Sequence, residues 1–213
     1  MKIALIGATG FVGTALLDEL LDRGHEVRAL QRDATKVAPR PGLETRAVDV
    51  LNADDLAAQL AGVDAVVSAF NAGWTNPNLH DDFLRGSQRI ADAARAAGVR
   101  LLVVGGAGSL FIAPGQQLVD SPAFPAEWKQ GALAAREVLT RLRADQTTLD
   151  WTFVSPAIHL EPGERTGRYR LGTESPVVDA KGESRISVKD LAAAIVAEVE
   201  SPQYRRARFT AAY

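Results

Sequence analysis

Cysteine is absent from this sequence of 213 residues, which excludes disulfides, thiol nucleophiles and thiolate metal sites. Histidine is scarce, and its three residues, His25, His80 and His159, lie far apart in the chain. None of them belongs to a His-x-x-x-His pair, which would place two metal ligands on one face of a helix. We therefore expect no metal site in this protein.

A surplus of charge is missing as well, because 24 Lys and Arg face 26 Asp and Glu and leave a formal net charge of −2. A surface that binds DNA or RNA needs a large basic face, and the sequence indicates none. The densest basic cluster is Arg205, Arg206 and Arg208, and charge clusters of this kind usually face water. We expect these arginines at a solvated strand edge, and we expect no nucleic acid partner.

Long apolar runs are also missing, since none approaches the roughly 18 residues that a transmembrane helix requires. We expect no membrane association. The first residues enter a strand-like run directly, without the basic segment and cleavage site of a secretory signal. This pattern favours a cytoplasmic protein.

Short apolar runs alternate with longer amphipathic stretches over the first 155 residues. The runs are typical of buried strands, and the stretches are typical of helices, in which apolar residues recur every three to four positions. The alternation predicts βαβ units, and therefore an α/β fold of the Rossmann type with a doubly wound parallel sheet. The predicted strands cover residues 2–6, 26–30, 44–48, 64–69, 100–104 and 149–154, and the predicted helices cover residues 11–23, 53–60, 79–97 and 126–143. Asn52 is the expected N-cap of the second helix.

The pattern changes in two later parts of the chain. Residues 105–125 contain glycine and proline and predict a long loop, of a length that is usually functional or mobile. After Pro156 the sequence predicts short strands at residues 167–171 and 184–187, a helix at 188–199 and a last strand at 208–210. We expect one domain, 1–213, with a core of residues 1–155 and a small irregular C-terminal substrate lobe of residues 156–213. Ligands of open α/β folds bind beyond the carboxyl ends of the strands, and this lobe would cover that edge.

The motif Gly7-Ala8-Thr9-Gly10-Phe11-Val12-Gly13 follows the first predicted strand and opens the first predicted helix. Glycine allows a tight turn and lets the backbone approach a pyrophosphate without a Cβ atom in between. The free N–H groups and the dipole of the helix start attract the phosphates, and Gly13 would let the helix pack closely on the sheet. The motif predicts a bound dinucleotide, and its expected contacts are Gly7, Thr9, Gly10, Phe11, Val12 and Gly13.

Arg32 follows the second predicted strand, where an acidic residue would bind the ribose 2′-hydroxyl of NAD. An arginine can instead bind the 2′-phosphate of NADP in bidentate fashion, and Lys36 and Gln31 could assist it. The alternative is that Arg32 caps a solvated strand end and pairs with the adjacent Asp33. We expect NADP as the cofactor and keep NAD as the alternative.

The Gly-x-x-Gly-x-x-Gly spacing of residues 7–13 resembles the short-chain dehydrogenase/reductase superfamily. The segments HEVRALQRDATKV, AVDVLNADDLAAQLAGVDAVVSA and LDWTFVSPA are similar to its atypical, NmrA-like branch, and within it to the NADH-flavin reductases that resemble biliverdin reductase B. The resemblance runs from residue 2 to about residue 160. It implies that Asp49 and Val50 lie over the adenine, although an ordinary Asp turn explains Asp49 equally well. It also implies that the backbone of Ser68, Ala69 and Phe70 lines the nicotinamide ribose.

The proton-donor group of that superfamily is missing here. Its typical members use Ser, Tyr and Lys, with Tyr-x-x-x-Lys on a helix, and this chain has no such pair. At the expected helix stands Trp128-Lys129-Gln130-Gly131-Ala132, and Gly106 takes the place of the serine. The sequence therefore argues against ordinary carbonyl or alcohol chemistry, which needs a placed proton donor.

Hydride transfer to a flavin-like or quinone-like acceptor depends on stacking and alignment rather than on such a donor. We therefore expect an NADPH-dependent reductase of a small-molecule acceptor of this kind. The alternatives are a non-catalytic, NmrA-like dinucleotide sensor or regulator and, with less support, an epimerase or dehydratase. A homodimer is left open.

Two residues are the candidates for acid–base or hydrogen-bonding roles toward the acceptor. Ser109 lies just beyond the position of the missing serine, and His159 has an unperturbed pKa near 6.5 on the loop that leaves the sixth strand. Aromatic residues that could form the pocket wall are Phe111, Trp128 and Trp74. Each of these five side chains has simple packing or a surface position as its alternative, as do His80 and Lys129.

Overall fold

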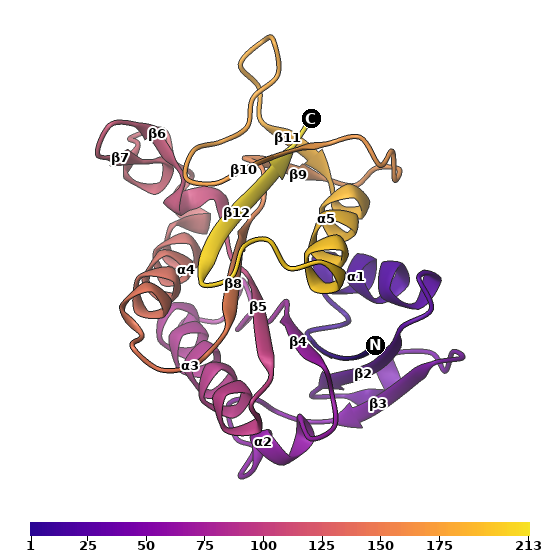
Figure 1. Cartoon of the computed structure of the whole chain (residues 1–213). Coiled ribbons are helices and arrows are strands. Elements are labelled where there is room, and N and C mark those ends of the chain that lie inside the picture. Colours follow the sequence, from indigo (N-terminus) through magenta and orange to yellow (C-terminus); the bar gives the residue numbers. More distant parts are fainter.

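The computed structural model describes residues 1–213 and contains one eight-stranded sheet in the order β10-β12-β8-β5-β4-β1-β2-β3 (Figure 1). Its strands are β1 (Lys2–Ile6), β2 (Glu26–Gln31), β3 (Leu43–Ala47), β4 (Ala65–Ser68), β5 (Arg100–Val104), β8 (Trp151–Ser155), β10 (Arg170–Gly172) and β12 (Ala207–Ala212). Every neighbouring pair is parallel except β10 and β12. The strand order reverses between β1 and β4, and open α/β sheets bind ligands at such a switch point. The predicted α/β fold of the Rossmann type is confirmed.

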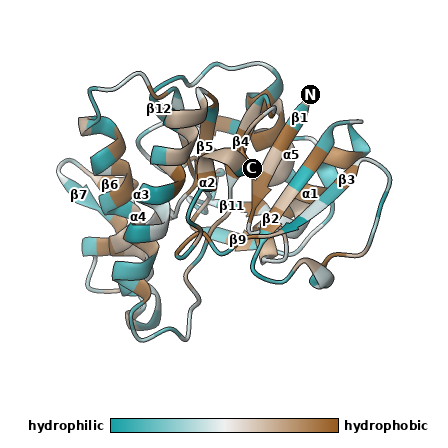
Figure 2. Cartoon of the chain, turned by 90° about the horizontal axis from the view of Figure 1, so that it is seen from below, coloured by the Kyte–Doolittle hydropathy of each residue, from teal (hydrophilic) through white to brown (hydrophobic).

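Helices cover both faces of this sheet (Figure 1). α1 (Phe11–Asp22) and α5 (Val188–Glu200) lie on one face, and α2 (Leu56–Gln59), α3 (Leu79–Ala97) and α4 (Ala126–Ala144) lie on the other. Side chains alternate along a strand, so Ile3 and Leu5 join the core under α1 and α5, whereas Ala4 and Ile6 join the core under α3 and α4. Figure 2 shows hydrophobic strands between helices that carry hydrophilic stretches.

Most predicted elements of the first 155 residues exist, with bounds that agree within a few residues. The strands at 2–6 and 100–104 and the helix at 79–97 have the predicted bounds. The predicted cap of α2 is wrong, because the carboxylate of Asp55 accepts the bond from the N–H of Ala58 at 2.9 Å. The amide of Asn52 instead donates to Asp49 at 2.8 Å, within the turn that precedes this helix.

The expected long loop of residues 105–125 contains structure of its own. Two short 3-10 helices, η2 (Ala107–Ser109) and η3 (Leu118–Asp120), flank a small hairpin of β6 (Phe111–Ala113) and β7 (Gln116–Gln117). A second small sheet pairs β9 (His159–Glu161) with β11 (Arg185–Ser187). Both small sheets stand at the end of the molecule where β12 ends (Figure 1).

The C-terminal part is more closely integrated into the fold than its sequence pattern predicts. β12 lies between β8 and β10 in the main sheet, and α5 packs against α1. The expectation that Arg208 faces water is therefore wrong: it is 1% exposed, because β12 is an interior strand. Arg205 and Arg206 precede the strand and are exposed, as predicted.

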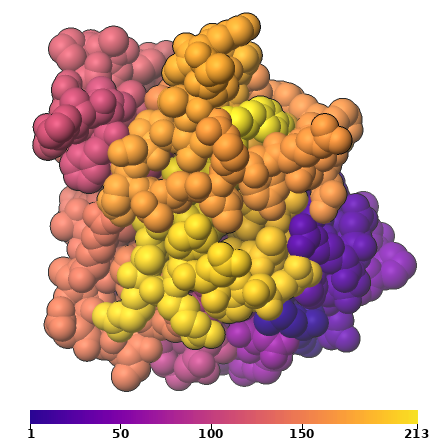
Figure 3. Space-filling model, turned by 45° about the horizontal axis from the view of Figure 1, so that its top comes forward, coloured from indigo at the N-terminus to yellow at the C-terminus, as the bar shows by residue number.

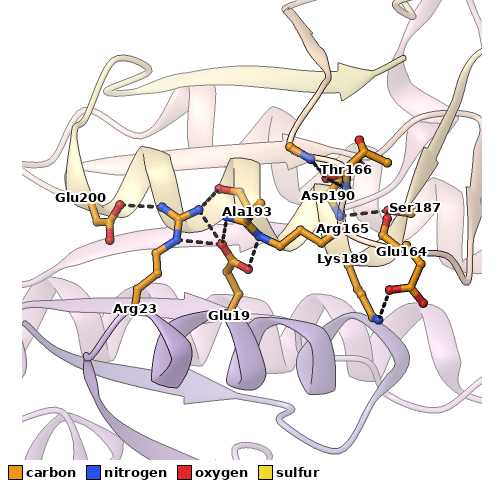
Figure 4. A network of polar contacts seen from close by, with 11 residues as sticks. Glu19, Arg23, Glu164, Arg165, Thr166, Ser187, Lys189, Asp190, Ala193 and Glu200 are labelled. Atoms are coloured by element: carbon orange, nitrogen blue, oxygen red, sulfur yellow. Dashed lines mark hydrogen bonds and ion pairs between the residues drawn. The ribbon is translucent and has the colours of Figure 1, made fainter.

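The loop between β9 and β10 is fastened to both α1 and α5 by polar contacts (Figure 4). Asp190 is fully buried on α5, and its carboxylate accepts hydrogen bonds from Thr166, Gly167 and the hydroxyl of Tyr213. Burial opposes the charged form, but these bonds outweigh it and lower the pKa of Asp190 below its ordinary value. On α1, Glu19 accepts bonds from Arg165 of the same loop at 2.8 and 2.9 Å.

None of the helices combines the length and the apolar composition needed to cross a bilayer. The cytoplasmic location stays a prediction.

Candidate dinucleotide-binding site

The glycine motif forms the turn between β1 and α1, directly beside the end of β4. Gly7 has φ +84°, a conformation that L side chains rarely adopt. A Cβ atom at this position would lie 2.5 Å from the carbonyl oxygen of Ala69. Gly7 must therefore be glycine both for its backbone angle and for the close approach of the two strand ends.

Gly13 is required for a different reason from the one its spacing suggests. A Cβ atom there would lie 1.9 Å from the carbonyl oxygen of Gly7. The first turn of α1 thus rests on the backbone of the glycine turn itself, and this contact rather than packing on the sheet excludes a side chain. Gly7 and Gly13 are both explained by the folded chain alone.

Gly10 is different, because the folded chain leaves room for a side chain there. The nearest atom to its hypothetical Cβ is the carbonyl oxygen of Gly7 at 3.5 Å, an ordinary contact. Its φ of −79° is open to any residue. A glycine at this exposed position fits a ligand that lies against the backbone.

The N-terminus of α1 offers backbone donors at the same place. Gly10 caps the helix without a side-chain bond, and no acidic residue stands in the first turn. The N–H groups of Phe11, Val12 and Gly13 make no hydrogen bond within the chain. Free N–H groups and the positive end of the helix dipole attract an anion, so the turn fits the pyrophosphate of a dinucleotide.

Arg32 stands exposed at the end of β2 and forms no hydrogen bond or ion pair within the chain. Its neighbour Asp33 caps η1 (Ala34–Lys36) instead, accepting bonds from the N–H and hydroxyl of Thr35 at 3.0 and 2.6 Å. These bonds lower the pKa of Asp33, and the hydroxyl bond contributes most. The pairing with Asp33 that the sequence left open is absent, and Arg32 is free to meet an anion, with Lys36 on the same loop.

Gln31, the last residue of β2, is buried, and neither its side-chain nitrogen nor its side-chain oxygen has a hydrogen-bond partner. A buried amide without partners costs free energy. It shares its side of β2 with Val27 and Ala29, which pack in the core beneath α1. A polar group bound at this edge of the sheet would satisfy it, which again fits a dinucleotide ribose.

The structure places the two residues expected over the adenine in ordinary roles. The carboxylate of Asp49 accepts from the N–H of Leu51 at 3.0 Å and from the amide of Asn52 at 2.8 Å, which is an Asp turn. Val50 is buried in the core cluster beneath α3 and α4. The turn accounts for Asp49 without a ligand, and the adenine contact stays a prediction.

The end of β4 presents backbone rather than side chains to the glycine turn. Ser68 is buried, and the carbonyl of Ala69 faces Gly7. The ring of Phe70 turns into the core, where it stacks on Phe83 with a centroid distance of 6.0 Å. Only the backbone of this segment is available to line a ribose.

The two catalytic candidates lie in different settings, and no hydrogen bond joins them. Ser109 is 2% exposed, and both its hydroxyl and its carbonyl oxygen accept bonds from Arg208, at 3.0 and 2.9 Å. His159 is exposed at the start of β9. Its backbone N–H donates to the carbonyl oxygen of Ser184, and its ring has no partner. These contacts account for Ser109 structurally, and a catalytic role for either residue stays a prediction.

No proton donor stands where the superfamily places its serine and tyrosine. Gly105 is pressed against the ring of Phe153, and a Cβ atom on Gly106 next to it would make an ordinary contact with Ala135 at 3.8 Å. Gly131 lies on α4 and faces the ring of Trp74, which precedes α3. A Cβ atom on Gly131 would be 2.8 Å from that ring. Of the other candidates, His80 bonds Asp81 at 3.0 Å, as a helix-surface residue would.

Comparison with known proteins identifies the class. A family model for NAD(P)H-binding proteins matches residues 7–202, and the chain belongs to this family. It is 41% identical to YwnB of Bacillus subtilis, over 99% of this chain and 97% of that protein. The resemblance inferred from the glycine motif is thereby confirmed at the level of the family.

Two solved structures are similar over the whole chain. One, from Bacteroides thetaiotaomicron and named a “putative epimerase”, is 45% identical with a TM-score of 0.91, covering 100% of this chain and 96% of that one. The other, from Streptococcus pneumoniae and named a “putative NADH-flavin reductase”, is 35% identical with a TM-score of 0.89, covering 100% and 99%. The two names differ in the reaction, so the comparisons define an NAD(P)H-binding oxidoreductase family without defining the acceptor.

Proposed function

We propose that this protein is an NADPH-dependent reductase that passes hydride directly to a flavin-like or quinone-like acceptor. The observation that carries the proposal is a dinucleotide site with room at Gly10 and a free Arg32, next to a helix α4 without a tyrosine–lysine pair. Bound NADPH supplies a hydride. The chain supplies binding and alignment.

Each part of the site has a role in holding the cofactor. The N–H groups of Phe11, Val12 and Gly13 bind the pyrophosphate. Arg32 binds the 2′-phosphate with charge-assisted bonds, and Lys36 adds a second positive charge. The backbone at Ala69 and Phe70 positions the nicotinamide ribose.

The acceptor takes its proton from water, because the serine and the tyrosine that donate protons in typical members of the superfamily are missing. Gly106 stands where typical members of the superfamily have a serine, and Trp128-Lys129-Gln130-Gly131-Ala132 stands on the helix where they have Tyr-x-x-x-Lys. A carbonyl reductase without them loses the roughly 10²- to 10⁴-fold that a placed general acid contributes. A flavin or quinone forms a stable reduced product, so alignment over the nicotinamide is the main requirement.

Turnover tests the proposal directly. Oxidation of NADPH is followed at 340 nm with FMN, FAD and simple quinones as acceptors, and NADPH binding is measured in parallel by calorimetry. We expect binding together with turnover of at least one of these acceptors. Binding without turnover of any of them would contradict the reductase and favour a second candidate, the dinucleotide sensor. Ser109 bonds to Arg208 and Trp74 packs on Gly131, so both residues have structural contacts that do not depend on catalysis.

A further inference from the structure

An apolar groove opens at the end of the molecule where β12 ends. It lies between the β6–β7 hairpin and the loop that follows β10, and Figure 3 shows the two segments as separate lobes with a notch between them. The groove has a volume of about 580 Å³. Residues 111–115 line one side and Pro176, Val178 and Gly182 line the other, with Ile158 also in the lining.

The groove brings exposed apolar side chains together. Ile112, Val178 and Ile158 belong to the few large hydrophobic side chains of the chain that are more than a third exposed, and they meet here. None of the residues that line the groove is charged. A concave apolar surface without charged side chains suits an uncharged ligand.

The groove adjoins the edge of the sheet that carries the glycine turn. Its hairpin wall follows β5, and Ile158 follows β8 after two residues. β5 pairs with β8 on one side and with β4 on the other, and β4 ends at the glycine turn. The nicotinamide half of a dinucleotide crosses the ends of β4 and β5 in this topology, so the groove lies on the acceptor side.

Buried polar contacts hold the two walls of the groove together. Arg208 donates to the carbonyl oxygens of Ser109, at 2.9 Å, and Glu174, at 3.1 Å, and its guanidinium pairs with the carboxylate of Glu174. The N–H of Phe111 also donates to the carbonyl oxygen of Glu174 at 2.9 Å. The Nε–H of Arg208 has no partner, so the bonds of its two other guanidinium nitrogens compensate for burying its charge. The walls therefore have a fixed separation, which is expected of a binding site rather than of two free loops.

We propose that this groove binds the electron acceptor, and that the acceptor is an uncharged, flat molecule of the quinone class rather than a flavin nucleotide. The proposal rests on the reductase function proposed above and narrows its substrate class. A flavin nucleotide carries a phosphate that would need a cationic partner, and the lining offers none. A quinone ring buries its apolar faces and leaves its carbonyl oxygens to water.

The reaction balances with the cofactor and water alone. The C4–H bond of the dihydronicotinamide breaks, and its hydride, with two electrons, adds to the quinone. A proton from water completes the hydroquinone, NADPH is oxidised to NADP⁺, and the quinone is reduced by two electrons. No further oxidant or reductant is required.

Binding tests the groove independently of turnover. Calorimetric titrations of the protein with 1,4-naphthoquinone and with FMN are compared for the wild type, Ile158→Asp and Leu171→Asp. The chain has no thiol that could add to the quinone. Ile158 and Leu171 are exposed to a similar degree, but Leu171 lies on β10 and outside the groove.

We expect the wild type and Leu171→Asp to bind naphthoquinone equally and more tightly than FMN, and Ile158→Asp to bind naphthoquinone at least about tenfold more weakly, since a carboxylate in an apolar site costs more than 1.4 kcal/mol. Tighter binding of FMN than of naphthoquinone, or unchanged quinone binding by Ile158→Asp, would overturn the proposal. Normal quinone binding without NADPH turnover would instead contradict the reductase function while leaving the groove assignment intact. NADPH affinity of all three proteins is measured as the control for the dinucleotide site.

Discussion

Gly13 and Gly7 touch through the backbone, so that a Cβ atom on Gly13 would lie 1.9 Å from the carbonyl oxygen of Gly7. Gly13→Ala must therefore move either the turn or the first turn of α1. We expect a loss of about 1–3 kcal/mol of unfolding free energy, typical of an overpacked site, and a fall in Tm of several degrees. Thermal unfolding followed by circular dichroism measures this. A variant as stable as the wild type would show that the contact is not close.

Arg32→Asp tests the preference for NADPH. Removing a charge-assisted phosphate contact costs roughly 1.5–3 kcal/mol, so we expect NADPH to bind at least about tenfold more weakly. NADH lacks the 2′-phosphate, and its affinity should change much less. Arg85→Asp is the matched control, because Arg85 is exposed on α3 and makes only a surface pair with Asp82. Equal NADPH affinity for the two variants would remove Arg32 from the site.

Asp190 makes the stability of the protein sensitive to acid. Its pKa is lower in the folded chain than in the unfolded chain, so its contribution is fully present above the ordinary pKa of about 3.8 and is lost as the pH falls through the lower folded value. Asp190→Asn leaves the donors of Thr166 and Gly167, which bond to this buried carboxylate, poorly matched and should cost about 1–3 kcal/mol at pH 7.

Between pH 7 and pH 3, the Tm difference between wild type and Asp190→Asn should stay constant at first and should shrink below the ordinary pKa of about 3.8. Denaturation curves at several pH values measure the difference. A Tm difference that stays constant over the whole range would show that the charge of the Asp190 carboxylate does not contribute to the stability of the fold.

Arg208→Met tests the fixed separation of the groove walls. The substitution removes one partner of Glu174, which keeps Arg143, and one partner of the carbonyl oxygen of Ser109, which keeps Gln117, and losing these bonds to a charged group costs about 1–3 kcal/mol. We expect a lower Tm and weaker naphthoquinone binding, with NADPH affinity unchanged because Arg208 touches none of the glycine turn. Loss of NADPH binding in a variant that is still folded would show that the groove and the glycine turn are not independent sites.

The fold could be predicted from the sequence where local patterns determine it. The buried strands at 2–6 and 100–104 are short apolar runs, and the helix at 79–97 repeats its apolar residues every three to four positions. The glycine turn could be predicted because its backbone demands are local, although Gly13 serves the turn rather than the sheet.

The parts that could not be predicted depend on contacts between residues far apart in the chain. Arg208 is buried because β12 lies inside the sheet and because Ser109, 99 residues earlier, accepts its bonds. The pairing of β9 with β11 joins His159 to Arg185 across a segment that contains β10, a strand of a different sheet. Trp74 packs on Gly131 although the two residues lie in different segments, and nothing in the sequence indicates this contact. The apolar groove likewise combines two segments that look like ordinary loops in the sequence.

Titration of NADPH into the wild type and into Gly10→Ala tests the central claim most directly. The chain itself leaves room for this methyl group, so both proteins should have the same Tm. The methyl group would stand where the pyrophosphate approaches the backbone, and we expect the wild type to bind NADPH and Gly10→Ala to bind it at least about tenfold more weakly. Equal affinities in two equally stable proteins would contradict a dinucleotide site at the glycine turn.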